Sequence, residues 1–391
     1  MKENAKRVQG FMRSKGIDLL LVSSPENVFY ISDVPTSYTA SNRLLFGSRR
    51  NAPVMCLIPA EGDPLLVFSA AALDIVQKHT WIADLRIYAT GTYILREVQP
   101  TLAGKDFFAA LSQSMNDKIN GHGSPKIAIE RNDLSALNFE FVQKDFARAT
   151  FADATDLLME ARMIKNEEEI QRFVKATKIL VKVMHKVEDA CKDRPTEWDL
   201  DIILKSEIMR EGAESWQQTT IAAGKVSGPD IYNQPVPKRR IKSGDIIRLD
   251  VGCVYKGYCA DLSRTYAVEK VPPRAAKTYK VLKDAYLKYI DEIAPGTPSS
   301  KINIDIVNYV KQNLDKEYYR GNVGHGVGVE LYDRPLLSET DNTPLQSGMT
   351  LSYEVPYHIA SLGGLNLEDS VLIRGDKKEV VSKYDRDIII V

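Results

Sequence analysis

Residues 249–265 read LDVGCVYKGYCADLSRT and contain two short strand-like runs on either side of a turn. Apolar and β-branched residues flank the turn candidate Tyr255-Lys256-Gly257, which indicates a β-hairpin. With a two-residue loop at Tyr255 and Lys256, Asp250 would lie directly opposite Asp261. Two like charges in that position repel each other. The stretch therefore predicts a partner for the two carboxylates, and a divalent cation is the partner that carboxylate oxygens suit best.

Three further side chains in the second half of the chain have the chemistry of metal ligands. They are His325 in NVGHGVGV, Glu354 in LSYEVPY and Glu368 in LNLEDSV. The glycines around His325 leave room for close approach of backbone and imidazole, and each acid stands in an apolar run where burial alone would be unfavourable. Taken singly, each residue also suits a structural role, as a turn former, a loop histidine or an exposed acid. Taken together with the aspartates, they supply enough donors for two metal ions.

Size and charge restrict the possible classes of protein. A chain of 391 residues exceeds the usual size of one core, so two domains are expected. Lys plus Arg and Asp plus Glu number 52 each, so no net charge favours nucleic acid or an anionic membrane. The N-terminus is charged, and no apolar run of about 18 residues occurs. We therefore expect a cytoplasmic protein with no membrane segment and no nucleic-acid partner.

The four cysteines show no CxxC spacing and are too few for a disulfide framework in so long a chain. Cys253 and Cys259 flank the hairpin turn, one position out of register with each other. A cross-strand disulfide and two buried thiols both remain open, and buried thiols are the favoured interpretation.

Hydrophobic patterning changes near residue 154. Before it, apolar runs such as Asp18–Val22 and Pro53–Pro59 are bounded by turn residues, which is typical of buried strands in an α/β layer. After it come long amphipathic helical patterns and several β-like stretches. The simplest architecture for residues 155–391 is a set of helices covering a strongly curved antiparallel sheet, so the fold class is α+β with a smaller N-terminal α/β domain at residues 1–154.

The ordered set DVG, ADLSRT, GHGVG, YEVP and LED resembles the metal-binding motif of the pita-bread-fold metallopeptidases. This group contains methionine aminopeptidase, aminopeptidase P and prolidase, with creatinase as a metal-free relative. ARMIKNEEEIQRFVKAT resembles the first helix of their catalytic domain, and GIDLLLVSSPENVFYISD resembles the start of the accessory domain of the prolidase-like branch. The likeness spans the chain and implies a pita-bread domain at residues 155–391 after a creatinase-like domain at residues 1–154.

The resemblance implies a function and a set of roles. Asp250, Asp261, His325, Glu354 and Glu368 would bind two divalent ions (Mn, Co, Fe or Zn, with Mn favoured), and Asp261 and Glu368 would bridge them. A bridging water would be the nucleophile, and Glu354 would be the catalytic residue that shuttles its proton. The expected enzyme is a homodimeric hydrolase of C–N amide bonds, an Xaa-Pro dipeptidase or aminopeptidase that acts on small peptides.

Two substrate-side histidines of prolidase-like peptidases are replaced here by Asn233 and Tyr332, and an arginine of aminopeptidase P is replaced by Asn366. Asn233 and Tyr332 can still donate hydrogen bonds to substrate. The changes nevertheless keep two other functions open. One is a small-molecule amidohydrolase or lyase that uses the same metals, and the other is a non-catalytic binding protein with the same fold.

Other polar residues are weaker candidates for substrate binding. His358 follows Glu354 by four residues and would supply an imidazole, or would simply end a strand. Arg334 would bind a substrate carboxylate, although an ion pair with a neighbour such as Asp333 is favoured. Three arginines of the first domain would select an anionic group, although a solvated surface is the favoured explanation: Arg43, Arg49 and Arg50.

Overall fold

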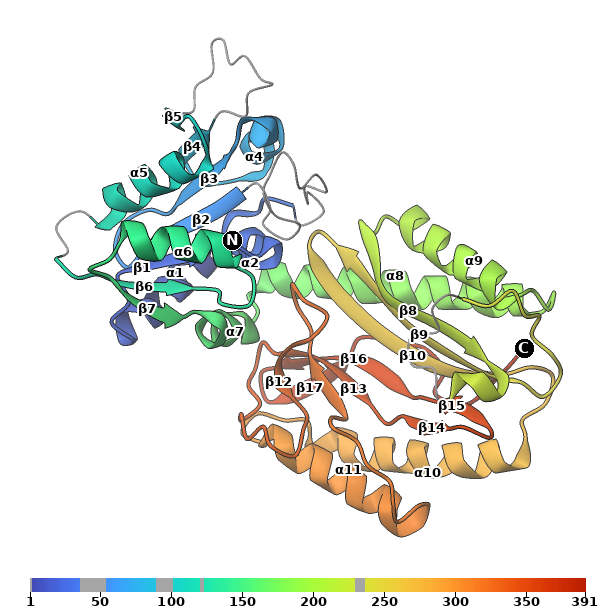
Figure 1. Cartoon of the computed structure of the whole chain (residues 1–391). Coiled ribbons are helices and arrows are strands. Elements are labelled where there is room, and N and C mark those ends of the chain that lie inside the picture. The colour runs from blue at the N-terminus through green and yellow to red at the C-terminus, as the bar shows by residue number, and fades with distance from the viewer. Residues whose placement is uncertain (1, 36–53, 89–100, 120–122, 229–235) are drawn as a thin grey trace. The chain divides into compact units, whose positions relative to one another are not determined.

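The structure is a computed structural model, and it describes residues 2–35, 54–88, 101–119, 123–228 and 236–391. Contacts between residues divide the chain into two compact units, Met1–Arg162 and Met163–Val391 (Figure 1). Four residues considered above lie outside the described ranges: Arg43, Arg49, Arg50 and Asn233. No helix in the described ranges is long and apolar enough to cross a membrane.

In the first unit, the described residues form an α/β layer around one sheet, whose strand order is β5-β4-β3-β2-β1-β6-β7. Among the described strands, β2 alone runs antiparallel to the rest. It pairs antiparallel with β1 and β3, and every other neighbouring pair is parallel. The strands are β1 (Leu19–Val22), β2 (Val54–Pro59), β3 (Leu65–Ser69), β4 (Asp84–Tyr88), β5 (Thr101–Gly104), β6 (Lys126–Ile129) and β7 (Thr150–Asp153). The helices are α1 (Lys2–Ser14), α2 (Pro25–Ser32), η1 (Ala70–Ala72), α4 (Leu73–His79), α5 (Phe107–Ile119), α6 (Ala136–Asp145) and α7 (Thr155–Met163).

Helix α7 belongs almost entirely to the first unit. The Tyr30 hydroxyl donates to the carbonyl of Ala161 at 2.7 Å, and Arg162 donates to Oδ1 of Asn27 at 2.8 Å. These contacts hold α7 on the first unit, which extends to Arg162.

The second unit consists of helices over a large sheet. Its helices are α8 (Glu167–Cys191), α9 (Glu197–Arg210), η2 (Gly224–Ser227), α10 (Pro273–Tyr289), η3 (Ile290–Glu292) and α11 (Ser299–Asn313). Its strands are β8 (Ser215–Ala223), β9 (Ile246–Tyr255), β10 (Tyr258–Ala267), β11 (Gly324–Gly326), β12 (Asp333–Leu336), β13 (Thr350–Glu354), β14 (Tyr357–Ile359), β15 (Gly363–Leu365), β16 (Glu368–Arg374), β17 (Lys377–Val380) and β18 (Ile389–Ile390). The main path of the sheet is β12-β11-β13-β16-β10-β9-β8, while β17 pairs with β16 and β18 with β10.

The helices of this unit lie on one face of the sheet (Figure 1). Helices α8 and α9 pack against Leu249 and neighbouring odd-numbered residues of β9. Helices α10 and α11 pack against Leu351 and Tyr353 of β13. Because side chains alternate along a strand, Asp250 and Glu354 point to the opposite face. The curved antiparallel sheet expected from the sequence is confirmed. Alternation of side chains along its strands separates the helix-covered core from the polar face.

The hairpin that the sequence predicts is present, but its predicted register is wrong. The loop is Lys256-Gly257, and Tyr255 pairs with Tyr258. Both loop residues have positive φ, 47° for Lys256 and 72° for Gly257, as a type I′ turn requires, and glycine suits that conformation where tyrosine does not. Asp261 therefore lies opposite Gly252, not opposite Asp250. A shift of two residues keeps every side chain on its original face, so the two aspartates still share one face.

All four cysteines are buried and free. In the observed register Cys253 lies opposite Ala260 and Cys259 opposite Val254, so the two thiols point to opposite faces of the hairpin. The cross-strand disulfide considered from the sequence is therefore not formed.

Candidate metal centre

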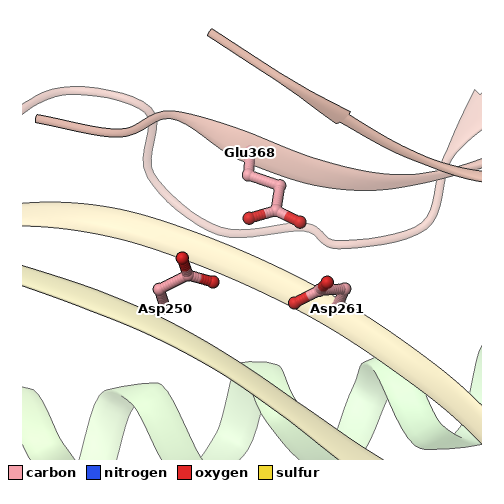
Figure 2. Close-up of side chains that lie close together, drawn as sticks. All are labelled: Asp250, Asp261 and Glu368. Carbon is pink, nitrogen blue, oxygen red and sulfur yellow. The ribbon is translucent and has the colours of Figure 1, made fainter. Parts of the chain in front are cut away.

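The side chains of Asp250, Asp261 and Glu368 point toward one another across three strands (Figure 2). One carboxylate oxygen from each lies within 4.8 Å of the others. Asp261 and Glu368 are buried and Asp250 is half-buried. Three carboxylates at this separation match the donor spacing of a site for a divalent cation.

Strand register places the predicted ligands in two adjacent rows. In the first row, Ser263 of β10 lies opposite both Asp250 of β9 and Glu368 of β16. Glu368 in turn lies opposite Glu354 of β13. This row crosses four neighbouring strands and brings three acids, which are distant in sequence, onto one line.

The second row holds Asp261 and His325. Asp261 precedes Ser263 by two residues, and Ser352 precedes Glu354 by two, so both lie one row over on the same face. His325 of β11 pairs with Ser352, and its Nε2 lies 3.7 Å from Oδ2 of Asp261. All five predicted ligands therefore share one face of the sheet.

Glycines bring the strand of His325 close to its neighbours. A side chain at Gly324 would lie 2.2 Å from the carbonyl oxygen of Ser352, and one at Gly326 would lie 2.2 Å from the carbonyl oxygen of Arg334. Gly324 also has a φ of 141°. The close approach of neighbouring backbone that the GHGVG motif predicts is therefore present. At Gly324 and Gly326 the observed backbone leaves no room for a larger residue.

The electrostatics of the centre suit a bound cation. Burial, followed by the charge of Glu354, raises the pKa of Asp250 to about 7, and the Arg248 guanidinium partly opposes this rise. Burial and neighbouring carboxylates raise the pKa values of Asp261 and Glu368 well above their usual range. Oδ1 of Asp261 is buried and has no hydrogen-bond partner among the described residues. Carboxylates that repel one another and a buried acceptor without a donor are what divalent ions would neutralise, so these residues fit a metal site.

His325 is neutral in this environment, because burial lowers the pKa of its imidazole. Nδ1 lies 3.0 Å from the carbonyl oxygen of Gly326, so it carries the hydrogen and leaves Nε2 as the free lone pair beside Asp261. The ring of Tyr332 stacks on the imidazole with centroids 3.7 Å apart. A neutral imidazole held in this way is the form that binds a metal ion.

Glu354 lies at the edge of the centre and is held at both oxygens. Nδ2 of Asn366 donates to Oε2 at 3.2 Å, and Nη2 of Arg320 lies 3.4 Å from Oε1. Glu368 accepts a hydrogen bond from the hydroxyl of Ser352. In the sequence, Asn366 stands out only as a replacement of an arginine, and nothing singles out Arg320.

The predicted substrate residues lie in different surroundings. Tyr332 is 46% exposed beside His325, and burial of its hydroxyl raises the pKa, so the hydroxyl stays protonated. Nδ1 of His358 lies 3.0 Å from Nη1 of Arg248, and burial, together with the arginine charge, lowers the pKa of this histidine to about 3. Arg334 is half-buried on β12, where the neighbouring Asp333 lies 3.7 Å from Lys165.

Arg248 is a further polar residue of this face that was not predicted from the sequence. It is 1% exposed on β9, two residues before Asp250, and therefore points to the same face. Because a guanidinium only donates, Nδ1 of His358 accepts from it, and His358 is neutral with its hydrogen on Nε2. An arginine inside the strand run IIRLDV was the available signal.

The fold and the donor set define a class of protein, the metal-dependent hydrolases whose centre lies on the open face of a curved sheet. The profile of metallopeptidase family M24 matches residues 171–375, and that of the creatinase/prolidase N-terminal domain matches residues 5–164. The chain belongs to metallopeptidase family M24, and it is therefore a hydrolase that uses divalent metal. The family and the fold inferred from the sequence motifs are thus confirmed.

Individual relatives match most or all of the chain. The chain is 30% identical to the putative Xaa-Pro aminopeptidase of Mycoplasma genitalium, covering 88% of this chain and 93% of that protein. It is 25% identical to the Xaa-Pro dipeptidase of Pyrococcus horikoshii, covering 100% and 99%. The crystal structure of the prolidase from Pyrococcus horikoshii OT3 matches with a TM-score of 0.81 at 23% identity, over 99% of this chain and 100% of that one.

Proposed function

We propose that the protein hydrolyses the amide bond between a first residue and proline in Xaa-Pro dipeptides or short peptides. The main support is that the carboxylates of Asp250, Asp261 and Glu368 come together on one face of the sheet. His325 and Glu354 lie in the two rows of residues that hold these carboxylates. These five residues would hold two divalent ions, with manganese favoured. Such ions supply a water of lowered pKa and polarise the amide carbonyl. The names of the matched relatives support the Xaa-Pro substrate.

Glu354 is the proposed proton carrier. Its carboxylate lies at the end of the acidic row, and Asn366 and Arg320 orient it from both sides. It would take a proton from the attacking water and pass it to the proline nitrogen as the C–N bond breaks. The side chains that would contact the peptide are those predicted from the sequence: Asn233, Tyr332, His358 and Arg334.

The test starts from metal-free protein loaded with manganese, cobalt, iron or zinc. Metal content is measured after gel filtration, and turnover is measured on Leu-Pro, Leu-Leu and a C-terminal amide of Leu-Pro. We expect two ions per chain and turnover of Leu-Pro, with no turnover of Leu-Leu. The change Asp261→Ala should abolish both metal retention and turnover, because it removes the proposed bridging carboxylate.

The outcomes separate the remaining possibilities. Two bound ions without any dipeptide turnover would contradict the Xaa-Pro proposal and favour a small-molecule amidohydrolase or lyase. Activity that survives Asp261→Ala would show that the metal ligands are misassigned. The homodimer and the cytoplasmic location expected from the sequence remain predictions, and light scattering of the purified protein tests the first.

A further inference from the structure

Arg320 forms an ion pair with the proposed proton carrier, Glu354. It lies in the segment before β11, and its Nη2 is 3.4 Å from Oε1 of Glu354. Asn366 donates to the other oxygen of Glu354, at 3.2 Å. The positive charge of Arg320 also lowers the pKa values of Asp250 and His358, so the guanidinium acts electrostatically on this part of the centre.

Part of this guanidinium has no partner. Nε of Arg320 is buried and makes no hydrogen bond with any described residue. The side chain as a whole is 25% exposed, so solvent or a ligand can reach it. A buried donor without an acceptor is unfavourable unless a ligand or water provides one. Because Arg320 lies next to Glu354, the carbonyl oxygen of a bound amide substrate would be within its reach.

The two positions that carry substrate-side histidines in prolidase-like peptidases supply no cation here. Tyr332 stays protonated, and its ring stacks on His325. Asn233 carries an uncharged amide. Arg320 therefore offers the charge-assisted donors that these residues lack.

We propose that Arg320 is a catalytic residue that binds the oxygen of the scissile amide as this oxygen becomes an oxyanion. The inference rests on the proposed function. Water attacks the carbonyl carbon, its proton passes to Glu354, and the C=O electron pair moves onto the oxygen that faces Arg320. When the oxyanion collapses, the C–N bond breaks, and the proton on Glu354 moves to the leaving nitrogen. Arg320 donates hydrogen bonds throughout and keeps its own protons.

The first test compares Arg320→Gln and Arg320→Lys with Arg374→Gln in manganese-loaded protein. Arg374 is a matched control, because it forms an ion pair with Glu167 at 3.1 Å but has a side chain that is 53% exposed. We expect Arg320→Gln to lower kcat on Leu-Pro by roughly 100-fold to 1,000-fold. Metal content and KM should change little, and the same loss should appear on the C-terminal amide of Leu-Pro if that amide is a substrate. Added guanidinium should restore part of the kcat of Arg320→Ala.

Two results would overturn the proposal. If Arg320→Gln loses metal in proportion to activity, the arginine only holds the ligand Glu354. If the variant raises KM without lowering kcat, and only for substrates with a free carboxylate, the arginine anchors the carboxylate instead.

A second test does not depend on turnover. Inorganic phosphate, a tetrahedral anion, is titrated calorimetrically into the metal-loaded proteins. Arg320→Gln should weaken phosphate binding by about 10-fold or more, and Arg374→Gln should not change it. Equal affinities in the wild type and Arg320→Gln, or no binding by either, would overturn the role of Arg320. Phosphate binding that depends on Arg320, without hydrolysis of any Xaa-Pro dipeptide, would refute the proposed substrate but not the anion site.

Discussion

Asp250 has a carboxyl pKa of about 7 because burial disfavours its charged form. In the unfolded chain an aspartate has a pKa of about 3.9. The folded, metal-free protein therefore binds more protons than the unfolded chain between these two values. The group contributes stability below about pH 4, and this stability is lost as the pH rises to about 7. The raised pKa values of Asp261 and Glu368 act in the same direction.

In the metal-free protein, the free energy of unfolding should therefore be lower at neutral pH than at pH 5, as far as this group of carboxylates contributes to it. We expect the change Asp250→Asn to raise the Tm of metal-free protein at pH 7.5 by several degrees, on the order of 5 °C. At pH 4.5 the same change should have little effect, because the native carboxyl is already protonated. Calorimetry in the presence of a chelator measures both. Equal effects at the two pH values would contradict the assignment of a raised pKa.

Single residues also show how far the sequence is informative. The five proposed ligands could be selected because each is an acid or histidine in an apolar or glycine-rich run. Arg320 stands in YYRGNV, which resembles an ordinary surface loop, and only the pairing of β11 with β13 brings it to Glu354. Contacts of this kind arise from tertiary structure and leave no local pattern in the sequence.

At the scale of elements, the hairpin could be predicted but its register could not. The alternation of apolar residues defines both strands, while the loop position depends on which residues accept positive φ. Placing Gly257 inside the loop, with Lys256 before it, gives the observed pairing. The two aspartates nevertheless share one face, as the predicted register also required, because an error of two residues conserves the alternation.

Strand β11 provides a test of how the backbone positions His325. The change Gly324→Ala would place a methyl group 2.2 Å from the carbonyl oxygen of Ser352 and impose a strained φ of 141°. We expect β11 to move away from β13, with a loss of roughly 2 kcal/mol in the free energy of unfolding and about 10-fold weaker metal binding. Urea unfolding and metal titration measure these effects. Gly321→Ala is the control, because nothing lies within 4 Å of its added carbon, and equal behaviour of the two variants would refute the constraint.

At the scale of the whole molecule, composition and periodicity predicted an α/β part followed by an α+β part, and both are present. The strand order of the first sheet was not predictable, since it depends on long-range pairing between strands with similar apolar sequences. The proposed metal ligands all belong to the second unit, because they lie on β9, β10, β11, β13 and β16.

Metal removal should therefore act unevenly along the chain. A ligand that binds only the folded state stabilises it by mass action. We expect chelation to increase backbone hydrogen exchange in β9, β10, β13 and β16 by about 10-fold or more, and to leave β1–β3 unchanged. Hydrogen exchange with mass spectrometry on the full chain measures this. The change Asp261→Asn should remove the response to metal, whereas a uniform change in both units would contradict a centre confined to the second.

The two ligand rows also restrict how the chain length can vary in evolution or in engineering. Inserting or deleting one residue within β9, β10, β13 or β16 would reverse the facing of every side chain beyond that point and send a carboxylate into the helix-covered core. Length changes are tolerable only in connections, where they leave the facing of the strands intact. In a library of insertion variants, these four carboxylate-bearing strands should therefore tolerate no insertion, and this can be seen without any assay of activity.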